Sequence, residues 1–392
     1  MDDADEAEPA RPEKAGRGGP LQRVAAIAIG TVLALLGAEL VMHVPGLPLP
    51  RDLSTYLFQC YYPSYEPDRI LFENERLYIN LHKPNFQAKC HWNGYSWRHR
   101  SDAWGGRNPE SWSKVDVVLL GDSMIYGHGV EEEDTMAHKL RERLGVRVAN
   151  LAVMGDSVPQ YMARLRNFAL PLRPRVVFVF LFGGNDISDL IQTRPPRMMR
   201  RFISRGDAPE AGIFPRDLLL GSVPSKTGFG QLVEHQALLY RTARFYLLKG
   251  EKKPAPMVAS DFPEDTAPPN GPPPGDLRPR ERLAIRYLEA ALTLMRDSAK
   301  AANTELVLVF LPGLSQGDSR EDRLVFNQAR LQASELGLHF LDATPVQYAN
   351  GHPIPGARLA YDGHLSPSGH TALAALLADY IERNRLLAEE PR

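Results

Sequence analysis

The sequence has only two cysteines, Cys60 and Cys90, in 392 residues. Neither belongs to a C-x-x-C pair, and no histidine stands at the spacing of a structural zinc site, so a zinc-binding fold is not expected. In an oxidising compartment the two cysteines can form one disulfide, which is our expectation. Two buried free thiols are the alternative.

The sequence also lacks an excess of either charge, with 46 lysines and arginines against 47 aspartates and glutamates and a net charge of −1. A basic surface attracts the phosphates of nucleic acids, and this composition offers no such attraction. Nucleic acid is therefore not an expected partner. Hydrophobic residues make up 43% of the chain, which is enough for a large core.

Long uncharged runs are scarce, and the longest one follows a polar tail at residues 1–22 that is rich in Pro, Gly and Ala. The run covers Val24–Ala38, and its extension past Glu39 to Val44 reaches the ~20 residues that a membrane helix needs. We predict a disordered tail and a transmembrane anchor at 23–44. A cleaved signal peptide is the alternative, although no small-x-small site follows the run, and a buried soluble helix is the third.

Basic residues near this run are more numerous before it than behind it. They are Arg11, Lys14, Arg17 and Arg23 on the one side and Arg51 on the other. The positive-inside rule then places the tail in the cytoplasm and the rest of the chain outside the membrane.

Two regions have no regular pattern. Residues 45–114 are rich in aromatic side chains with few periodic apolar runs, so we expect an irregular lead-in to the main domain. Residues from about 192 to 280 combine a basic stretch with a Pro-rich one, so we expect a partly disordered insertion.

Apolar strands alternate with amphipathic helices over residues 115–390. "VDVVLLGDS", "VRVANLAVMG" and "RVVFVFLFGGND" predict strands, "DTMAHKLRERLG" predicts a helix, and "SPSGHTALAALLADYIERNRL" predicts a last helix with Ser366 as N-cap and Pro367 at its first position. Continuous Val, Leu and Phe strands separated by helices indicate a parallel sheet covered on both faces. The predicted fold is a three-layer α/β/α sandwich with a parallel, flavodoxin-like sheet.

Ser123 directly follows the first predicted strand and precedes a short helix. Its hydroxyl can serve as a nucleophile at the edge of the sheet, where the N–H groups of a helix N-terminus favour a developing negative charge. A helix cap is the competing interpretation, because Ser and Asp are the common cap residues.

The next two strands end in similar polar turns. Gly155 ends the second strand, and a glycine lets a backbone N–H approach a substrate closely. Asn185 follows the third strand, and its side-chain amide can donate to the same oxyanion, while Asp186 is expected to fix the loop. Ordinary turn formation is the alternative for both blocks.

Asp362 and His364 stand just before the last predicted helix, in "YDGHLSPSGH". With flexible Gly363 between them, the carboxylate can fold back and hold the imidazole Nδ1, which leaves Nε2 to take a proton from Ser123. A turn followed by an exposed histidine is the alternative. The competing imidazoles are His128, His352 and His370.

These blocks together resemble those of the GDSL/SGNH hydrolase family, over about residues 115–387. "GDSMIYGHGV" is similar to the family's serine block, "NLAVMGDS" to its glycine block, "GGND" to its asparagine block, and "DGH" to its last block. The family usually has two residues between the Asp and the His of that block, whereas only Gly363 stands between them here. The resemblance implies an SGNH hydrolase fold, a triad and an oxyanion hole. The triad would comprise Ser123, Asp362 and His364, and the oxyanion hole Ser123, Gly155 and Asn185.

The resemblance also implies an activity. We expect a serine esterase or O-acyltransferase that forms an acyl-enzyme on Ser123 and needs no metal or organic cofactor. An anchor followed by an aromatic lead-in resembles a subgroup associated with envelope polysaccharides and acyl modification, so the expected substrate is an ester on a cell-envelope glycan or a lipid. The expected location is the cytoplasmic membrane, with the catalytic domain on its outer face. A non-catalytic binding or assembly protein on the same scaffold is the alternative.

Overall fold

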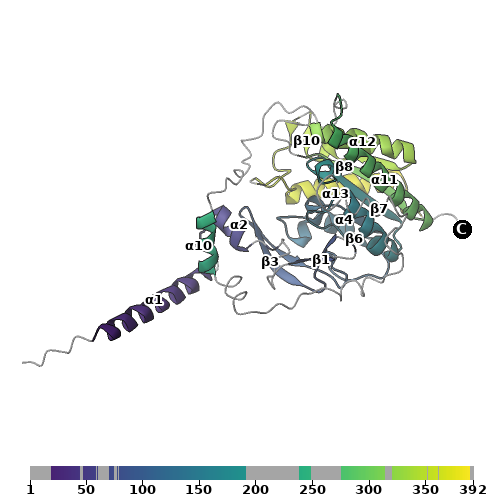
Figure 1. The fold of residues 1–392 in the computed structure, drawn as a ribbon. Coiled ribbons are helices and arrows are strands. Elements are labelled where there is room, and N and C mark those ends of the chain that lie inside the picture. Colours follow the sequence, from purple (N-terminus) through teal and green to yellow (C-terminus); the bar gives the residue numbers. More distant parts are fainter. Residues whose placement is uncertain are drawn as a thin grey trace, which may run out of the picture.

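A five-stranded parallel sheet forms the centre of the molecule (Figure 1). The computed structural model describes residues 19–44, 47–58, 60, 70–74, 77, 79–190, 238–248, 275–313, 320–350, 352–360 and 362–388. The strands are β5 (Val117–Leu120), β6 (Val148–Asn150), β7 (Val176–Phe182), β8 (Glu305–Leu311) and β9 (His339–Asp342). Their order is β6-β5-β7-β8-β9 and every neighbouring pair is parallel, which is the flavodoxin-like order and confirms the predicted fold class.

Helices cover both faces of this sheet and so produce three layers. One face packs against α5 (Val158–Arg164), α11 (Pro279–Ala301) and α12 (Arg320–Leu336), and the other against α4 (Met136–Leu144) and α13 (Pro367–Arg383). Successive strand residues point to opposite faces. Val118 and Leu120 therefore belong to one core, and Val117 and Leu119 to the other.

Two of the helices that cover the sheet, α4 and α13, begin at a residue whose side chain satisfies a free backbone N–H group. Thr135 caps α4 by accepting a hydrogen bond from the His138 N–H at 3.3 Å, and the helix ends at Gly145 with a φ of 65°. Ser366 caps α13 by accepting from the Gly369 N–H at 3.2 Å, and Pro367 takes the first position, as the sequence predicts.

The shorter elements are α3 (Ser123–Tyr126), α6 (Asp186–Asp189), β10 (Tyr348–Ala349), β11 (His352–Pro353), η1 (Glu132–Asp134), η2 (Leu165–Ala169), η3 (Leu170–Leu172) and η5 (Thr344–Val346).

The lead-in is more regular than the sequence predicts. The segment expected to be irregular, 45–114, contains α2 (Arg51–Phe58) and two antiparallel hairpins: β1 (Leu71–Asn74) with β2 (Ile79–His82), and β3 (Gln87–Trp92) with β4 (Tyr95–Arg100). The second hairpin turns at Asn93 and Gly94, with φ of 46° and 87°, which is the left-handed geometry of a two-residue hairpin turn. The side chains of β3 and β4 alternate in polarity, with Ala88, Cys90 and Trp92 on one face of β3 and Tyr95, Trp97 and His99 on one face of β4. The sequence therefore carries a short period-2 signal that the prediction of an irregular segment overlooked.

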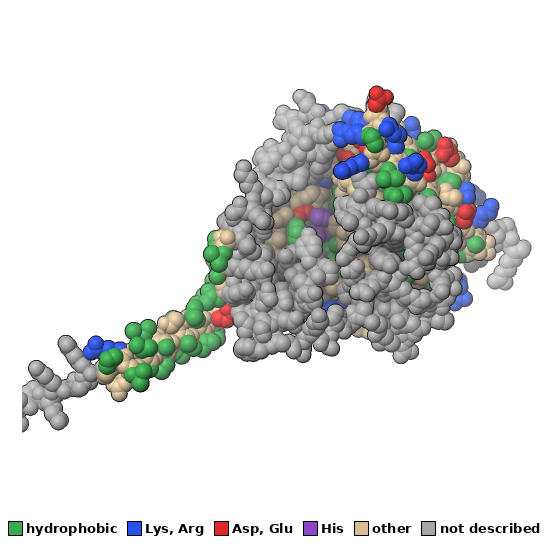
Figure 2. Space-filling model, viewed as in Figure 1, with side chains coloured by type: hydrophobic (Ala, Val, Ile, Leu, Met, Phe, Trp, Pro, Cys, Tyr) green, Lys and Arg blue, Asp and Glu red, His purple; other side chains and the backbone are tan. Residues whose placement is uncertain are grey.

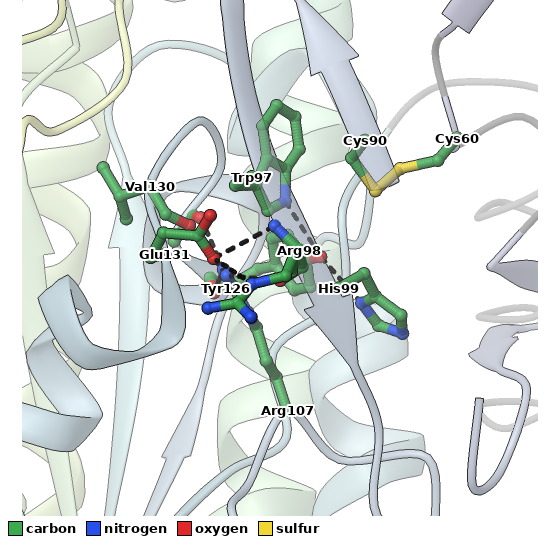
Figure 3. The surroundings of a disulfide bond; sticks show 10 residues. Cys60, Cys90, Trp97, Arg98, His99, Arg107, Tyr126, Val130 and Glu131 are labelled. Atoms are coloured by element: carbon green, nitrogen blue, oxygen red, sulfur yellow. Dashed lines mark hydrogen bonds and ion pairs between the residues drawn. A yellow bond between two sulfur atoms is a disulfide. The ribbon is translucent and has the colours of Figure 1, made fainter. Parts of the chain in front are cut away.

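A disulfide joins Cys60 to Cys90 on β3, with their Cα atoms 5.1 Å apart (Figure 3). Both cysteines are buried, and Trp97 on the neighbouring strand belongs to the same core. The bond therefore attaches the β3–β4 hairpin to the chain that follows α2.

Helix α1 (Pro20–Met42) has 23 residues, none of them buried, and it projects away from the rest of the molecule (Figure 1). Its apolar side chains cover most of its surface (Figure 2). The helix is long and apolar enough to cross a membrane, and signal sequences can share both properties.

One helix of the predicted insertion, α10 (Leu238–Leu248), contacts both α1 and α2. The Glu39 carboxylate of α1 accepts hydrogen bonds from the N–H groups of Leu238 and Leu239, each at 2.8 Å. The remainder of the insertion up to residue 274 and most of the predicted tail, residues 1–18, lie outside the described residues.

The disulfide closes a loop of 30 residues in the lead-in. Replacing both cysteines, Cys60→Ser with Cys90→Ser, should lower the free energy of unfolding by about 2–4 kcal/mol, because the unfolded chain gains the freedom that the cross-link removes. Thermal unfolding of the detergent-solubilised full chain, followed by near-UV circular dichroism, measures the loss. Wild type in a reductant should behave like the double variant, and equal stability of oxidised wild type and variant would contradict the prediction.

Candidate active site

Ser123 lies at the carboxyl end of β5, the strand between β6 and β7, where the chain turns sharply into α3. Gly121 is required in this turn, since a Cβ there would lie 2.5 Å from Ile125 Cγ1. The cap of α3 is Asp122, whose carboxylate accepts a hydrogen bond from the Met124 N–H at 2.9 Å. Because Asp122 satisfies the helix terminus, the Ser123 side chain is not the cap and its hydroxyl is left for another partner.

That partner is His364, whose Nε2 lies 2.8 Å from Ser123 Oγ, although the two residues are 241 positions apart in the chain. The other ring nitrogen of His364, Nδ1, forms a short hydrogen bond with Oδ1 of Asp362. The structure thus brings together the three residues that the sequence proposes as a triad. A neutral His364 with its proton on Nδ1 can accept the Ser123 hydroxyl proton on Nε2.

One residue between Asp362 and His364 is enough for the carboxylate to reach the imidazole, because the carboxylate folds back over its own loop. The same Oδ1 accepts a hydrogen bond from the backbone N–H of His364 at 3.0 Å, which is the geometry of an Asx turn. The guanidinium of Arg358 supports this loop by donating to the Gly363 carbonyl at 3.0 Å and to the Pro312 carbonyl at 2.9 Å. The loop thereby places the carboxylate against Nδ1 without the usual spacing.

Asp362 is ionised in this setting. Its burial by itself raises the pKa, but the positive charge and hydrogen bonds of His364 outweigh burial and hold the pKa of Asp362 below its ordinary value. The second carboxylate oxygen, Oδ2, accepts a hydrogen bond from the Asn93 side-chain amide at 3.0 Å. Sequence reasoning missed Asn93; its "NG" dipeptide predicts a hairpin turn, but nothing in the sequence predicts which side chain it meets.

The imidazole of His128 is stacked on that of His364, with ring centroids 3.9 Å apart and planes inclined by 9°. Trp92 and Trp97 pack against His128, with ring centroids at 5.6 Å and 5.0 Å. Burial, followed by the positive charge of His364, lowers the pKa of His128 well below its ordinary value, so this ring stays neutral. His128 therefore supports one face of His364, and it is His364 Nε2 that accepts the hydrogen bond of the Ser123 hydroxyl.

The other two competing histidines occupy different positions. His370 is fully buried on α13, and burial, then the positive charges of Arg107 and His364, lowers the pKa of its imidazole to about 3. His352 is exposed on the short strand β11.

Gly155 and Asn185 lie in the turns that follow the strands on either side of β5. The Val153 N–H donates to the Gly121 carbonyl at 3.2 Å, which joins the turn of Gly155 to the turn of Ser123. Gly155 has a φ of 75°, and the space where a Cβ would stand is open, so its backbone conformation is what requires glycine. The Asn185 amide donates one hydrogen bond to Asp189 Oδ2 at 2.9 Å, and the second N–H of an amide can serve an oxyanion.

The aspartate in each of these three turns has a structural task. Asp122 caps α3; Asp156 pairs with Arg164 in a buried ion pair; Asp186 accepts from the Phe182 N–H at 2.7 Å and from the Tyr161 hydroxyl at 3.2 Å. Burial raises the pKa of Asp122 and of Asp156 to about 6, and that of Asp186 well above its ordinary value. Asp186 fixes its loop in the structure, which was its expected task.

Among the described residues, one group of His, Cys, Asp or Glu side chains is close enough to be tested as a metal site: His128, Asp362 and His364, with donor atoms within 4.8 Å of one another. A metal ion lies in the plane of each imidazole that binds it. The two imidazoles are nearly parallel and stacked, so their lone pairs cannot converge on one ion. Both nitrogens of His364 are also engaged with Ser123 and Asp362. The group does not fit a metal.

A flavodoxin-like sheet with a serine, a histidine and an aspartate in hydrogen-bond contact at its carboxyl edge has the architecture of a hydrolase. The sequence model of the GDSL-like lipase/acylhydrolase family matches residues 119–372, which is more than half of the chain. The protein therefore belongs to this family.

Several solved structures are similar to the chain. The lipase/acylhydrolase from Enterococcus faecalis is 13% identical with a TM-score of 0.38, covering 69% of this chain and 96% of its own. A GDSL-like lipase from Bacteroides thetaiotaomicron is 12% identical with a TM-score of 0.36, covering 69% and 88%. The psychrotrophic esterase EstA from Pseudoalteromonas is 11% identical with a TM-score of 0.36, covering 69% and 98%. No curated protein sequence matches the chain.

The buried carboxyl of Asp122 makes stability depend on pH. Burial raises its pKa from the ordinary 3.8 to about 6, so between these values the folded chain holds a proton that the unfolded chain releases. The contribution of Asp122 to the free energy of unfolding therefore falls as the pH rises from 3.8 to about 6. Asn also caps helices but cannot ionise, so Asp122→Asn should gain about 3 kcal/mol relative to wild type between pH 4 and pH 7.

Urea denaturation at pH 4, 5, 6 and 7 measures the difference between wild type and Asp122→Asn. Asp297→Asn, which removes an exposed carboxylate on α11, is the control for loss of a negative charge. A difference between Asp122→Asn and wild type that stays constant across this range would refute the assignment.

Proposed function

We propose that the protein is a serine hydrolase or O-acyltransferase that forms an acyl-enzyme on Ser123. The observation that carries the proposal is the 2.8 Å contact between Ser123 Oγ and His364 Nε2, with His364 Nδ1 bonded to an ionised Asp362. Membership of the GDSL-like lipase/acylhydrolase family supports an ester as the bond that reacts.

The proposed reaction starts when His364 Nε2 takes the Ser123 hydroxyl proton as Oγ attacks the ester carbonyl carbon. Asp362 stabilises the imidazolium that forms, and the N–H groups of Ser123 and Gly155 with the Asn185 amide stabilise the oxyanion. The tetrahedral intermediate collapses by breaking the bond to the leaving alkoxide, which receives the proton from His364. The acyl group then stays on Ser123 Oγ.

The second half of the reaction depends on the acceptor. Water, deprotonated by His364, releases the acyl group as a carboxylic acid and makes the protein an esterase. A sugar hydroxyl in place of water makes it an O-acyltransferase, because both acceptors attack the same acyl-enzyme. A screen of acyl donors and hydroxyl acceptors, with the mass of the Ser123 adduct as readout, distinguishes the two reactions and measures the acyl length.

We also propose that α1 is an uncleaved membrane anchor and that the catalytic domain lies outside the cytoplasmic membrane. Its length and apolar surface support an anchor, and the excess of basic residues before it supports this orientation. The Cys60–Cys90 disulfide is in keeping with an oxidising compartment. The proposed substrate is accordingly an ester on a cell-envelope glycan or a lipid.

The alternative function is a non-catalytic binding or assembly protein on the same scaffold. A protein of that kind does not need the hydrogen bond between Ser123 and His364. The presence of this hydrogen bond favours the hypothesis of an enzyme.

Replacing Ser123 by alanine should lower kcat for a short-chain aryl ester by about 10⁴-fold or more, since no other group can take over the covalent step. A fluorophosphonate probe should label wild type but not Ser123→Ala, and the variant should keep the thermal stability of wild type. Equal labelling of the two proteins, with no ester hydrolysis by either, would favour the binding protein.

The proposed orientation predicts the behaviour of reporters fused to the C-terminus of the full chain. A periplasmic alkaline phosphatase reporter should be active, and a cytoplasmic β-galactosidase reporter should not be, because the chain after α1 crosses to the outer side. Immunoblotting for the fused chain checks that α1 is retained. The opposite pattern of activities would reverse the orientation.

A further inference from the structure

The β3–β4 hairpin of the lead-in touches the proposed catalytic acid. Asn93, at the tip of this hairpin, donates its side-chain N–H to Oδ2 of Asp362 at 3.0 Å, across 269 positions of sequence. His364 binds the other oxygen, Oδ1. The hairpin lies outside residues 119–372, the part of the chain that matches the family, so this contact is an addition to the matched domain.

Several contacts hold the hairpin in this place. The backbone N–H of Asn93 donates to Thr55 Oγ1 on α2 at 2.9 Å, and the Cys60–Cys90 disulfide fixes β3 (Figure 3). On β4, the N–H of Arg98 donates to Glu131 Oε2 at 3.1 Å. The tip of the hairpin is therefore attached from both strands, and it presents the Asn93 amide in one orientation.

A buried network on the inner side of β4 adds to this attachment. The Tyr126 hydroxyl, from the last residue of α3, lies 2.8 Å from Nδ1 of His99 and 3.4 Å from Nε1 of Trp97 (Figure 3). The Arg107 guanidinium donates to the Tyr126 carbonyl at 3.0 Å and to the Gly127 carbonyl at 2.6 Å. The hairpin is thus connected directly to the helix that begins with Ser123.

We propose that Asn93 is a positioning residue for Asp362, so that the lead-in hairpin completes the catalytic site. The inference rests on the proposed function. Asp362 has a side chain only 4% exposed, where water is a poor substitute for a lost donor. With both oxygens bonded, the carboxylate cannot rotate away from His364 Nδ1. Without Asn93, one oxygen loses its donor, and the carboxylate holds the imidazole less firmly.

The test compares two substitutions at Asn93. Glycine removes the amide but tolerates the φ of 46°, so Asn93→Gly keeps the turn. It should lower kcat by about tenfold and leave KM within about twofold, because a charge-assisted hydrogen bond to the acid is lost while the rest of the site is kept. The rate at which a fluorophosphonate labels Ser123 should fall by a similar factor.

Asn93→Asp keeps the shape of the side chain and adds a negative charge beside Asp362. Two carboxyl groups this close raise the pKa of one of them, so the pair shares a proton at low pH. Above that pKa both are charged and favour the protonated form of His364, whereas the reaction needs its neutral form. The acid limb of the pH profile of kcat/KM should therefore move to higher pH, by about one pH unit. A purely structural defect lowers the profile without moving it, so this readout remains decisive where a variant is also less stable.

Two control variants match these changes. Asn85→Gly makes the same substitution at a lead-in asparagine with a φ of 49° and an exposed side chain, and it should keep the kcat of wild type. Thr55→Val removes the hydrogen bond between the Asn93 backbone N–H and the Thr55 hydroxyl but leaves the Asn93 side-chain amide. It should lower kcat by less than Asn93→Gly does.

The outcomes separate this inference from the proposed function. If wild type does not react with the fluorophosphonate at Ser123, the proposed function fails. If wild type reacts but Asn93→Gly keeps its kcat and Asn93→Asp keeps its pH profile, the positioning inference is overturned while the proposed function stands.

Discussion

The parallel pairing of β5 with β6 and β7 is the constraint on which the site depends. Parallel strands end at the same edge of a sheet, and β5 places its turn between the turns of its two neighbours. Ser123 follows β5, while Gly155 and Asn185 follow the strands on either side. Hydrogen bonding within the sheet thereby gathers three segments that are far apart in the chain, and the loop before α13 adds the imidazole and the acid.

The three turns are held by buried carboxyl groups, and this arrangement lowers stability near neutral pH. Asp122, Asp156 and Asp186 each bind backbone or side-chain donors from their own turn or from α5, and burial raises the pKa of each. An apolar side chain would avoid the cost of desolvation but would not accept the hydrogen bonds that order the turn. The buried carboxyl groups thus make the turns at the edge of the sheet rigid and lower the free energy of unfolding.

The lead-in connects the proposed anchor to the site through a short series of contacts. Glu39 near the end of α1 binds the N-terminus of α10, α10 contacts α2, and Thr55 of α2 binds the turn that carries Asn93. The segment before the catalytic domain is therefore more than a spacer. It reaches Asp362 on one side and, through Trp92 and His128, the stacked face of His364 on the other.

The fold class, the last helix with its Ser366 cap, and the residues proposed for the triad could all be predicted from the sequence, because strand periodicity, helix caps and polar turns are local signals. Local signals of this kind are also present in β3 and β4, whose side chains alternate in polarity, but the prediction of an irregular lead-in overlooked them. Local signals did not settle the cap of α3, which is Asp122 and not Ser123. They also gave no indication of Asn93 or of the stack of His128 on His364. Those contacts join positions that are far apart in the chain, and only the packing of the hairpin and of the loop before α13 against the carboxyl edge of the sheet decided them.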